Sequence, residues 1–361
     1  MKMMKHFLAA FMMMTAASVW AAEPIIIKLW PNGAPNSNGA TKEKPASNNQ
    51  AWDFEPILTV WPAENPNGLA VLGLPGGGYS VLSNTHECKQ FNTYYNEQGI
   101  TFVCLDYRMP GGHKDVPLSD AQQAMRVIRE HADEWGFTKL GVMGASAGGH
   151  LASTVATHYV DDATKPDFQI LFYPVISMDM EITHQSSREL LLGQNPSEED
   201  VLLFSNEKQV TKDTPKAFII ACMDDFLVPV ENSIRYYQAL VKNRVPAAMH
   251  LYPKGGHGFG AGMNFGYAEQ WRDELKQWFK NEILNSGNNG GGFGGFGGFG
   301  GGFPGGVAPG GGFPGGGAPG GGFPGGGAPG GGFPGGGAPG GGFPGGGFGG
   351  GFPGGAPAAN N

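Results

Sequence analysis

Gly144-Ala145-Ser146-Ala147-Gly148 is the stretch that decides the fold of this chain. Residues 139–143 before it are mostly apolar and predict a buried strand, whereas residues 150–157 after it predict a helix. A serine in a tight turn between a strand and a helix holds its hydroxyl clear of the sheet. Glycines are needed on both sides of it, because the two backbones nearly touch there. The pattern therefore predicts a nucleophile on a strand–turn–helix elbow; the alternative is a glycine-rich turn with an incidental serine.

The N-terminal residues 1–21 read as a secretory signal peptide. Lys2 and Lys5 precede an apolar stretch at 7–17, and small residues near Ala21 suit cleavage. The alternative is a retained membrane anchor, but the apolar stretch is short for a span. We therefore expect a secreted, periplasmic or cell-surface protein with no transmembrane span after cleavage.

Residues 22–285 have the composition of one large folded domain. The net charge of the 361 residues is -8, and no charged side chain follows Glu282. This acidity argues against nucleic acid as a partner. The three cysteines are too few for a disulfide framework, and Cys104 and Cys222 stand in apolar runs where a buried thiol is expected. Their spacing fits no metal site, and we expect neither a metal nor a cofactor.

Residues 286–361 form a tail of glycine, phenylalanine, proline and alanine with almost nothing else. From residue 301 a ten-residue unit recurs, which is not the three-residue period of collagen. An uncharged segment of this composition cannot bury a core, so we expect disorder. Its phenylalanines suit weak contacts with polysaccharide, with itself or with the cell surface; the plainer interpretation is a linker.

Apolar runs and helical patterns alternate along the domain. Strands are expected at 25–30, 56–61, 69–74, 100–107, 139–143, 168–174, 216–223 and 247–252. Helices are expected at 84–98, from a capping box at 119–122 to Gly136, and at 150–157, 231–242 and 266–284. Residues 175–214 break this rhythm and suggest a short cap insertion. The alternation predicts an α/β fold, with a mainly parallel sheet and helices on both faces.

Three residue types suited to acyl transfer each follow a predicted strand. Ser146, an aspartate at 224–225 and His257 occur in the order Ser, Asp, His, which is typical of α/β-hydrolases. The histidine would take the serine proton, and the carboxylate would orient the imidazole. The family pattern D-x-x-V-P selects Asp225, with Asp224 as the alternative. His150, on the elbow helix, is expected to be packed and hydrogen-bonded.

A glycine loop, Pro75-Gly76-Gly77-Gly78-Tyr79, follows another predicted strand. Such a loop can turn its N–H groups outward, and a hydrolase needs these donors for the oxyanion, together with the N–H that follows the serine, here Ala147. The alternatives are a plain turn or a phosphate loop, but the phosphate-loop signature is missing.

Further motifs stand along the chain at Leu29-Trp30-Pro31-Asn32-Gly33-Ala34-Pro35, His86-Glu87, Leu105-Asp106-Tyr107-Arg108, 141–153, Ser205-Asn206-Glu207, 224–233 and 255–260. With them the chain, from Leu29 to about Asn281, resembles bacterial α/β-hydrolase esterases of the acetyl xylan esterase and BD-FAE (feruloyl esterase-like) type. Pro75 departs from the histidine of the related hormone-sensitive-lipase group and indicates the BD-FAE-like branch.

The resemblance implies site residues and a substrate class. It implies a nucleophile, an acid and a base at Ser146, Asp225 and His257. It also implies an oxyanion hole built by the N–H groups of Gly77, Gly78 and Ala147. Members of this group remove acetyl or aromatic acyl groups from plant polysaccharides.

We therefore expect a secreted serine carboxylesterase that acts on acylated carbohydrate such as xylan. Acetyl is the favoured acyl group because the insertion is short, and feruloyl is the alternative. A serine peptidase of the prolyl oligopeptidase type would share the order of the triad, but no propeller repeats occur in the sequence. A non-catalytic binding protein on the same scaffold would not need an intact triad.

Overall fold

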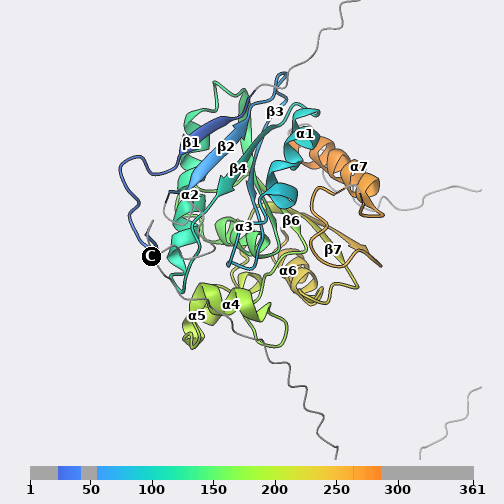
Figure 1. The fold of residues 1–361 in the computed structure, drawn as a ribbon. Helices are drawn as coiled ribbons and strands as arrows, with labels where there is room; N and C mark the ends of the chain where they lie inside the picture. The colour runs from blue at the N-terminus through green and yellow to red at the C-terminus, as the bar shows by residue number, and fades with distance from the viewer. Residues whose placement is uncertain (1–22, 42–54, 263, 286–361) are drawn as a thin grey trace, which may run out of the picture. The chain divides into compact units, whose positions relative to one another are not determined.

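An eight-stranded sheet forms the centre of the domain (Figure 1). The computed structural model describes residues 23–41, 55–262 and 264–285; the predicted signal peptide and the predicted tail lie outside them. The strand order is β1-β2-β4-β3-β5-β6-β7-β8. The strands are β1 (Ile25–Lys28), β2 (Ile57–Trp61), β3 (Gly68–Leu74), β4 (Thr101–Asp106), β5 (Phe137–Ala145), β6 (Phe168–Phe172), β7 (Lys216–Cys222) and β8 (Ala247–Tyr252).

The sheet is mainly parallel, as the alternation of strands and helices predicts. β1 pairs with β2 and β2 pairs with β4 in antiparallel fashion, while the pairs from β4 through β8 are parallel. Parallel strands are covered on both faces, which is why β4 and β6 are buried along their whole length. Their carboxyl ends lie at one edge, so the loops that follow β3, β5, β7 and β8 meet there.

Helices cover both faces of the sheet (Figure 1). Side chains of α2, α3 and α6 pack in one apolar cluster, and those of α1 and α7 pack in the cluster on the opposite face. The α-helices are α1 (Phe91–Asn96), α2 (Asp115–Glu130), α3 (Ala147–Thr157), α4 (Gln185–Leu192), α5 (Glu198–Leu203), α6 (Glu231–Lys242) and α7 (Ala268–Trp278). Shorter helical turns are η2 (Thr85–Lys89), η3 (Asn206–Lys208) and η4 (Phe279–Leu284). Within the described ranges, no helix combines the length and the apolar character that crossing a membrane requires.

The predicted capping box at 119–122 is wrong, because α2 begins earlier, at Asp115. Pro117 stands in its first turn, where a missing N–H costs nothing. Ser119 therefore lies inside the helix and donates its hydroxyl to the carbonyl of Val116 at 2.8 Å. Gln122, the other residue of the predicted box, donates its amide to the carbonyl of His158 at 2.8 Å. The neighbouring carboxylate of Asp120 accepts from the Arg108 guanidinium, with Nη2 to Oδ1 at 2.6 Å.

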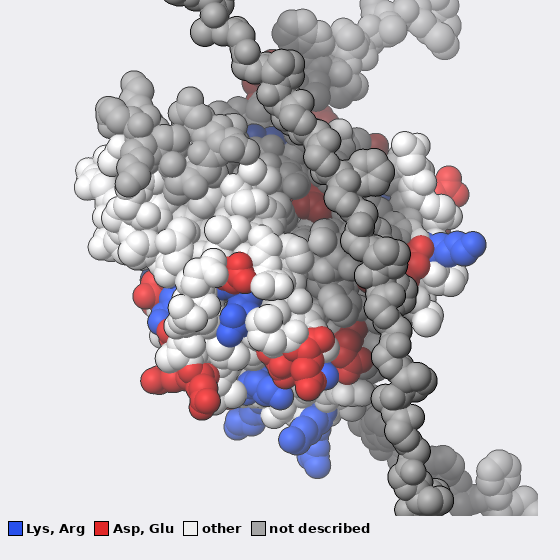
Figure 2. Space-filling view, turned by 60° about the horizontal axis from the view of Figure 1, so that its bottom comes forward, with Lys and Arg blue, Asp and Glu red and all other residues white. Residues whose placement is uncertain are grey.

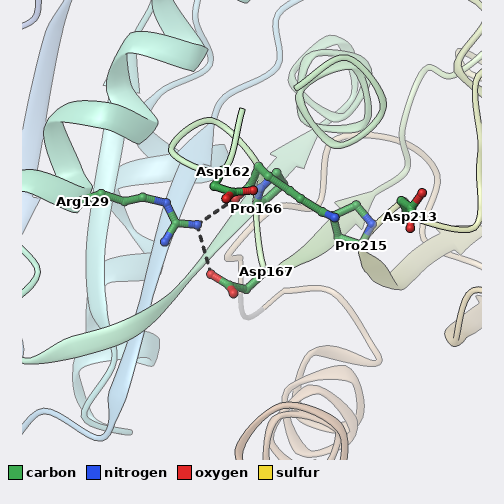
Figure 3. A pocket seen from close by; sticks show the side chains of 7 residues that line it. Arg129, Asp162, Pro166, Asp167, Asp213 and Pro215 are labelled. Carbon is green, nitrogen blue, oxygen red and sulfur yellow. Dashed lines mark hydrogen bonds and ion pairs between the residues drawn. The ribbon is translucent and has the colours of Figure 1, made fainter. Parts of the chain in front are cut away.

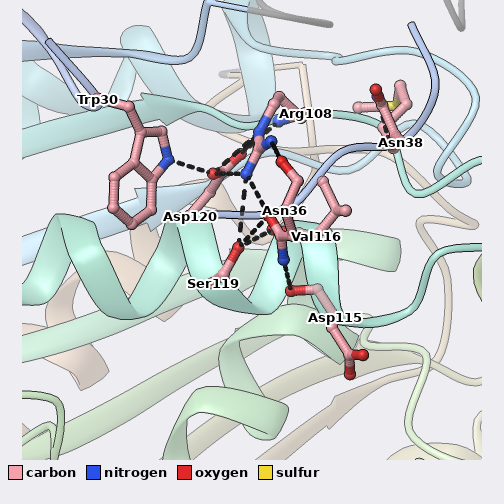
Figure 4. Close-up of polar contacts among 9 residues, drawn as sticks. Trp30, Asn36, Asn38, Arg108, Asp115, Val116, Ser119 and Asp120 are labelled. Atoms are coloured by element: carbon pink, nitrogen blue, oxygen red, sulfur yellow. Dashed lines mark hydrogen bonds and ion pairs between the residues drawn. The ribbon is translucent and has the colours of Figure 1, made fainter. Parts of the chain in front are cut away.

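The Arg108–Asp120 pair also fastens the N-terminal loop to the sheet (Figure 4). Both side chains are almost completely buried. Arg108 donates from Nη1 to the carbonyl of Asn36 at 2.8 Å, and the Trp30 indole N–H donates to Asp120 at 2.7 Å. Loss of one partner would leave a buried charge uncompensated, which typically costs 3–5 kcal/mol.

The expectation of a free, buried Cys104 is also wrong. Cys88 on η2 and Cys104 on β4 form a disulfide, with Cα atoms 5.8 Å apart. Cys222 is free and buried, as expected. The sequence separation of 16 residues carries no pairing signal, because only the packing of η2 on the sheet brings the two sulfurs together.

Residues 175–214 contain α4, α5 and η3. α4 and α5 lie side by side at the bottom of the view in Figure 1. Asn206 ties the segment to the elbow helix, because its amide donates to Ser153 Oγ at 2.8 Å and to the carbonyl of His150 at 3.1 Å. In the view from this end, acidic and basic side chains lie interspersed beside a broad uncharged area (Figure 2).

Candidate active site

Ser146 stands in the turn between β5 and α3, in a conformation that few residues adopt. Its φ is 54° and its ψ is −121°, and its N–H donates to the carbonyl of Phe172 at 3.0 Å. A Cβ on Gly144 would lie 2.0 Å from the carbonyl oxygen of Gly148, and one on Gly148 would lie 2.1 Å from that of Leu74. The close approach predicted for the two glycines is confirmed.

Three of the predicted side chains form a continuous hydrogen-bonded series. His257 Nε2 lies 2.8 Å from Ser146 Oγ, and His257 Nδ1 lies 2.7 Å from Asp225 Oδ2. The serine and the aspartate are buried and the histidine is partly buried. With Nδ1–H donating to the carboxylate, Nε2 is left as the acceptor for the serine hydroxyl, which is the arrangement of a base beside a nucleophile.

The two neighbouring aspartates have different environments. Asp225 Oδ1 accepts the N–H groups of Leu227 and Val228, and these two bonds hold the carboxylate in place while Oδ2 faces the histidine. Asp224 is exposed and accepts the N–H of Gly256 at 2.8 Å, a bond that lowers its pKa. The structure thus brings Asp225, and not Asp224, to the histidine.

The glycine loop lies against the elbow. A Cβ on Gly76 would lie 2.9 Å from Ser146 Cβ, and Gly77 and Gly78 have φ values of +119° and +64°. Within the described ranges, no residue accepts a hydrogen bond from the N–H of Gly77, Gly78 or Ala147. These donors are therefore free to bind an incoming oxygen.

The α4 segment contributes a histidine that the sequence reasoning did not single out. The ring of His184 lies over the glycine loop, with Cε1 3.5 Å from where a Cβ on Gly78 would stand. Its Nδ1 is 2.8 Å from the hydroxyl of buried Ser187. Burial and the nearby His257 lower its pKa, which favours the neutral ring. Nothing in its local sequence marks it, because only the folding of the insertion brings it to the site.

His150 is packed and hydrogen-bonded, as expected. Its Nδ1 is 2.9 Å from the hydroxyl of Tyr79, and its Nε2 is 2.8 Å from the carbonyl of Phe204. Burial lowers its pKa to about 4. A neutral ring satisfies both contacts and joins the glycine loop to the insertion.

A separate pocket lies away from these residues (Figure 3). Its volume is about 490 Å³, and it is lined by Arg129, Asp162, Lys165, Pro166, Asp167, Asp213 and Pro215. Asp167 and Pro215 directly precede β6 and β7, so this pocket opens at the amino ends of the strands, opposite Ser146. Arg129 is engaged by Asp167 at 3.1 Å and by the carbonyl of Lys165 at 2.7 Å. The pocket does not belong to the Ser146 site.

Comparison with known proteins agrees with the fold. The chain is 42% identical over 223 residues to an acetylxylan esterase of Xylanibacter ruminicola, a match that covers 60% of this chain and 46% of that protein. It is 37% identical over 205 residues to endo-1,4-beta-xylanase B of Butyrivibrio fibrisolvens, of which it covers 32%. The chain thus spans less than half the length of these curated relatives.

The structure is similar to that of an acetyl ester-xyloside bifunctional hydrolase from Caldicellulosiruptor lactoaceticus. The TM-score is 0.64 at 33% identity, and the match covers 73% of this chain and 98% of that one. The resemblance to acetyl xylan esterases predicted from the motifs is confirmed. A family model described as alpha/beta hydrolase fold matches residues 71–261, which include the elbow, Asp225 and His257. The chain therefore belongs to the alpha/beta hydrolase fold family.

Proposed function

We propose that this protein is a serine carboxylesterase that removes acyl groups, acetyl above all, from plant cell-wall carbohydrate such as xylan. The observation that carries the proposal is the series Ser146–His257–Asp225, in which both hydrogen bonds are shorter than 3 Å. An acyl-transfer reaction makes use of all three features together: an activated hydroxyl, an oriented imidazole and free N–H donors for the oxyanion.

The reaction follows from these positions. His257 Nε2 takes the proton as Ser146 Oγ attacks the ester carbonyl, and the N–H groups of Gly77, Gly78 and Ala147 bind the resulting oxyanion. His257 then returns the proton to the leaving sugar hydroxyl, which departs from the acyl-enzyme. Water, deprotonated by the same imidazole, releases the acid. Asp225 stays ionised throughout and stabilises the imidazolium.

Secretion is part of the proposal. The predicted signal peptide lies outside the described residues, but the Cys88–Cys104 disulfide supports an oxidising destination. The names of the relatives, acetylxylan esterase and acetyl ester-xyloside hydrolase, support acetylated xylan as the substrate.

A panel of substrates tests the proposal. Purified protein is offered acetyl, butyryl and feruloyl esters, acetylated xylan and a chromogenic peptide. We expect the highest kcat/KM on the acetyl ester and release of acetate from xylan. Faster release of ferulate would replace acetyl by feruloyl, and cleavage of the peptide alone would favour the peptidase alternative.

His184 supplies a prediction about the carbohydrate part of the substrate. Ser187 occupies Nδ1, whereas Nε2 has no hydrogen-bond partner among the described residues. In either tautomer of the neutral ring Nε2 can bond a sugar hydroxyl, as donor or as acceptor. Replacing His184 by alanine is expected to raise KM for acetylated xylan about 5- to 10-fold, the worth of one hydrogen bond. The kcat for a small acetyl ester should change little. An equal loss on both substrates would contradict a role in sugar binding.

A further inference from the structure

Glu87 is a buried carboxylate that the proposed reaction does not use. Its side chain is on η2, next to the disulfide-bonded Cys88, and the residue is only 3% exposed. A carboxylate in such a place is costly unless each oxygen is hydrogen-bonded. The two oxygens of Glu87 are indeed bonded, one to the glycine loop and the other to Tyr173. Tyr173 follows β6 and in turn bonds residues 255–261, the histidine loop.

One oxygen holds the glycine loop. Glu87 Oε2 accepts the N–H of Gly76 at 3.0 Å, directly before the two glycines whose N–H groups are free. The side chain fills the space beside Gly76, since a Cβ there would lie 2.5 Å from Oε2. The orientation of the following peptide groups therefore depends on this carboxylate.

The other oxygen reaches the histidine loop through Tyr173. The Tyr173 hydroxyl donates to Glu87 Oε1 at 3.0 Å and accepts the N–H of Gly260 at 2.8 Å. The Tyr173 ring also contacts the His257 ring, with centroids 4.7 Å apart. In addition, the carbonyl of His86 accepts the N–H of Ala261 at 2.8 Å.

Burial raises the pKa of Glu87 overall. The hydrogen bonds from Tyr173 and Gly76 and the positive forms of His86 and His257 act in the opposite direction and offset part of that rise. Burial and the Glu87 charge raise the pKa of Tyr173, so its hydroxyl keeps the proton that it donates. The titratable groups that interact with Glu87 are His86, Tyr107, Tyr173 and His257.

We propose that Glu87 is a positioning residue that fixes the glycine loop and the histidine loop relative to each other, and that its ionised form adds a second buried negative charge near the imidazolium of His257. The first negative charge is that of Asp225, which is bonded directly to the ring. The kinetic consequence rests on the proposed function, whereas the charge and the hydrogen bonds can be measured without any substrate.

The experiment compares the full-length variants E87Q and E207Q with the wild type. Glu207 is the matched control, because it is also buried and accepts a hydroxyl, that of Ser177 at 2.9 Å, but bonds neither loop. Histidine NMR gives the pKa of His257. Amide hydrogen exchange reports how often the hydrogen bonds donated by the N–H groups of Gly76 and Gly260 break. For E87Q we expect the pKa of His257 to fall by about 0.5 unit or more, since a negative charge stabilises the imidazolium. Exchange at both glycines should quicken about 10-fold relative to E207Q.

Kinetics on the acetyl ester add the functional readout. E87Q is expected to lose about 10- to 100-fold in kcat with little change in KM, and the acid limb of its pH profile should move to lower pH. Y173F should lose activity while Y236F, which removes the buried hydroxyl bound to Gln169 at 2.9 Å, should not. An unchanged His257 pKa and unchanged glycine exchange in E87Q would overturn the inference. That result stays distinct from failure of the proposed function, which would appear as a wild type inactive on every ester.

Discussion

Replacing Ser146 by alanine is expected to lower kcat/KM on an acetyl ester by about 10⁴-fold or more. The hydroxyl 2.8 Å from His257 Nε2 is the group that would form the acyl-enzyme, and without it only substrate binding and the oxyanion donors remain. Hydrolysis of a chromogenic acetate measures the loss. A serine-directed phosphonate should add one adduct to the wild type, detected by mass, and none at residue 146 of the variant.

Ser153→Ala is the matched control for this change. Ser153 is a buried serine on the same elbow helix and donates to the carbonyl of His150 at 2.9 Å, away from the catalytic side chains. Its loss should cost about 1 kcal/mol of stability and leave kcat close to that of the wild type. A Ser146→Ala protein that keeps the wild-type rate would contradict the assigned nucleophile.

Replacing Asp225 by asparagine is expected to lower kcat by about 10⁴-fold. An amide N–H facing His257 Nδ1 would force the proton onto Nε2, so the ring could no longer accept the serine proton. Asp224→Asn is the matched control, because an amide oxygen can still accept the N–H of Gly256. We expect that variant to stay within a few-fold of the wild type. The measurement is kcat on the acetyl ester, with thermal unfolding to compare the two folds.

The reverse pattern, with Asp224→Asn inactive and Asp225→Asn active, would return the acid role to the alternative that the sequence left open. Their position after the same strand does not separate these neighbours, and the sequence favours Asp225 only through the family pattern D-x-x-V-P. What separates them is the turn at 225–228, where two backbone N–H groups hold the Asp225 carboxylate toward the histidine.

The strands and the candidate site were predictable for a shared physical reason. Buried strands of a parallel sheet are continuous apolar runs, and the residues that follow them must meet at one edge. α6 and β8 even have the predicted bounds, 231–242 and 247–252. The elbow could be predicted because the close approach of the backbones requires glycine on both sides of the serine, and these glycines are visible in five consecutive residues.

The features that sequence reasoning missed depend on tertiary packing. The helix expected over 84–98 is divided into η2 and α1, and this division sets Glu87 between two loops and Cys88 against Cys104. Ser119 and Gln122 match a capping box, but α2 begins earlier, at Asp115, and Gln122 bonds the carbonyl of His158. His184 has no motif around it. In each case the partner is distant in the chain, so local periodicity contains no trace of the contact.

The place where the described domain ends has a practical consequence. Lys216, the first residue of β7, donates from Nζ to the carbonyl of Glu282 at 2.7 Å, and Lys139 near the start of β5 donates to that of Ile283. The end of the described domain therefore lies near the amino ends of β5 and β7, at the opposite edge of the sheet from Ser146. A solid support or fusion partner attached after residue 285 would therefore lie away from the candidate active site, which would remain accessible to an insoluble substrate.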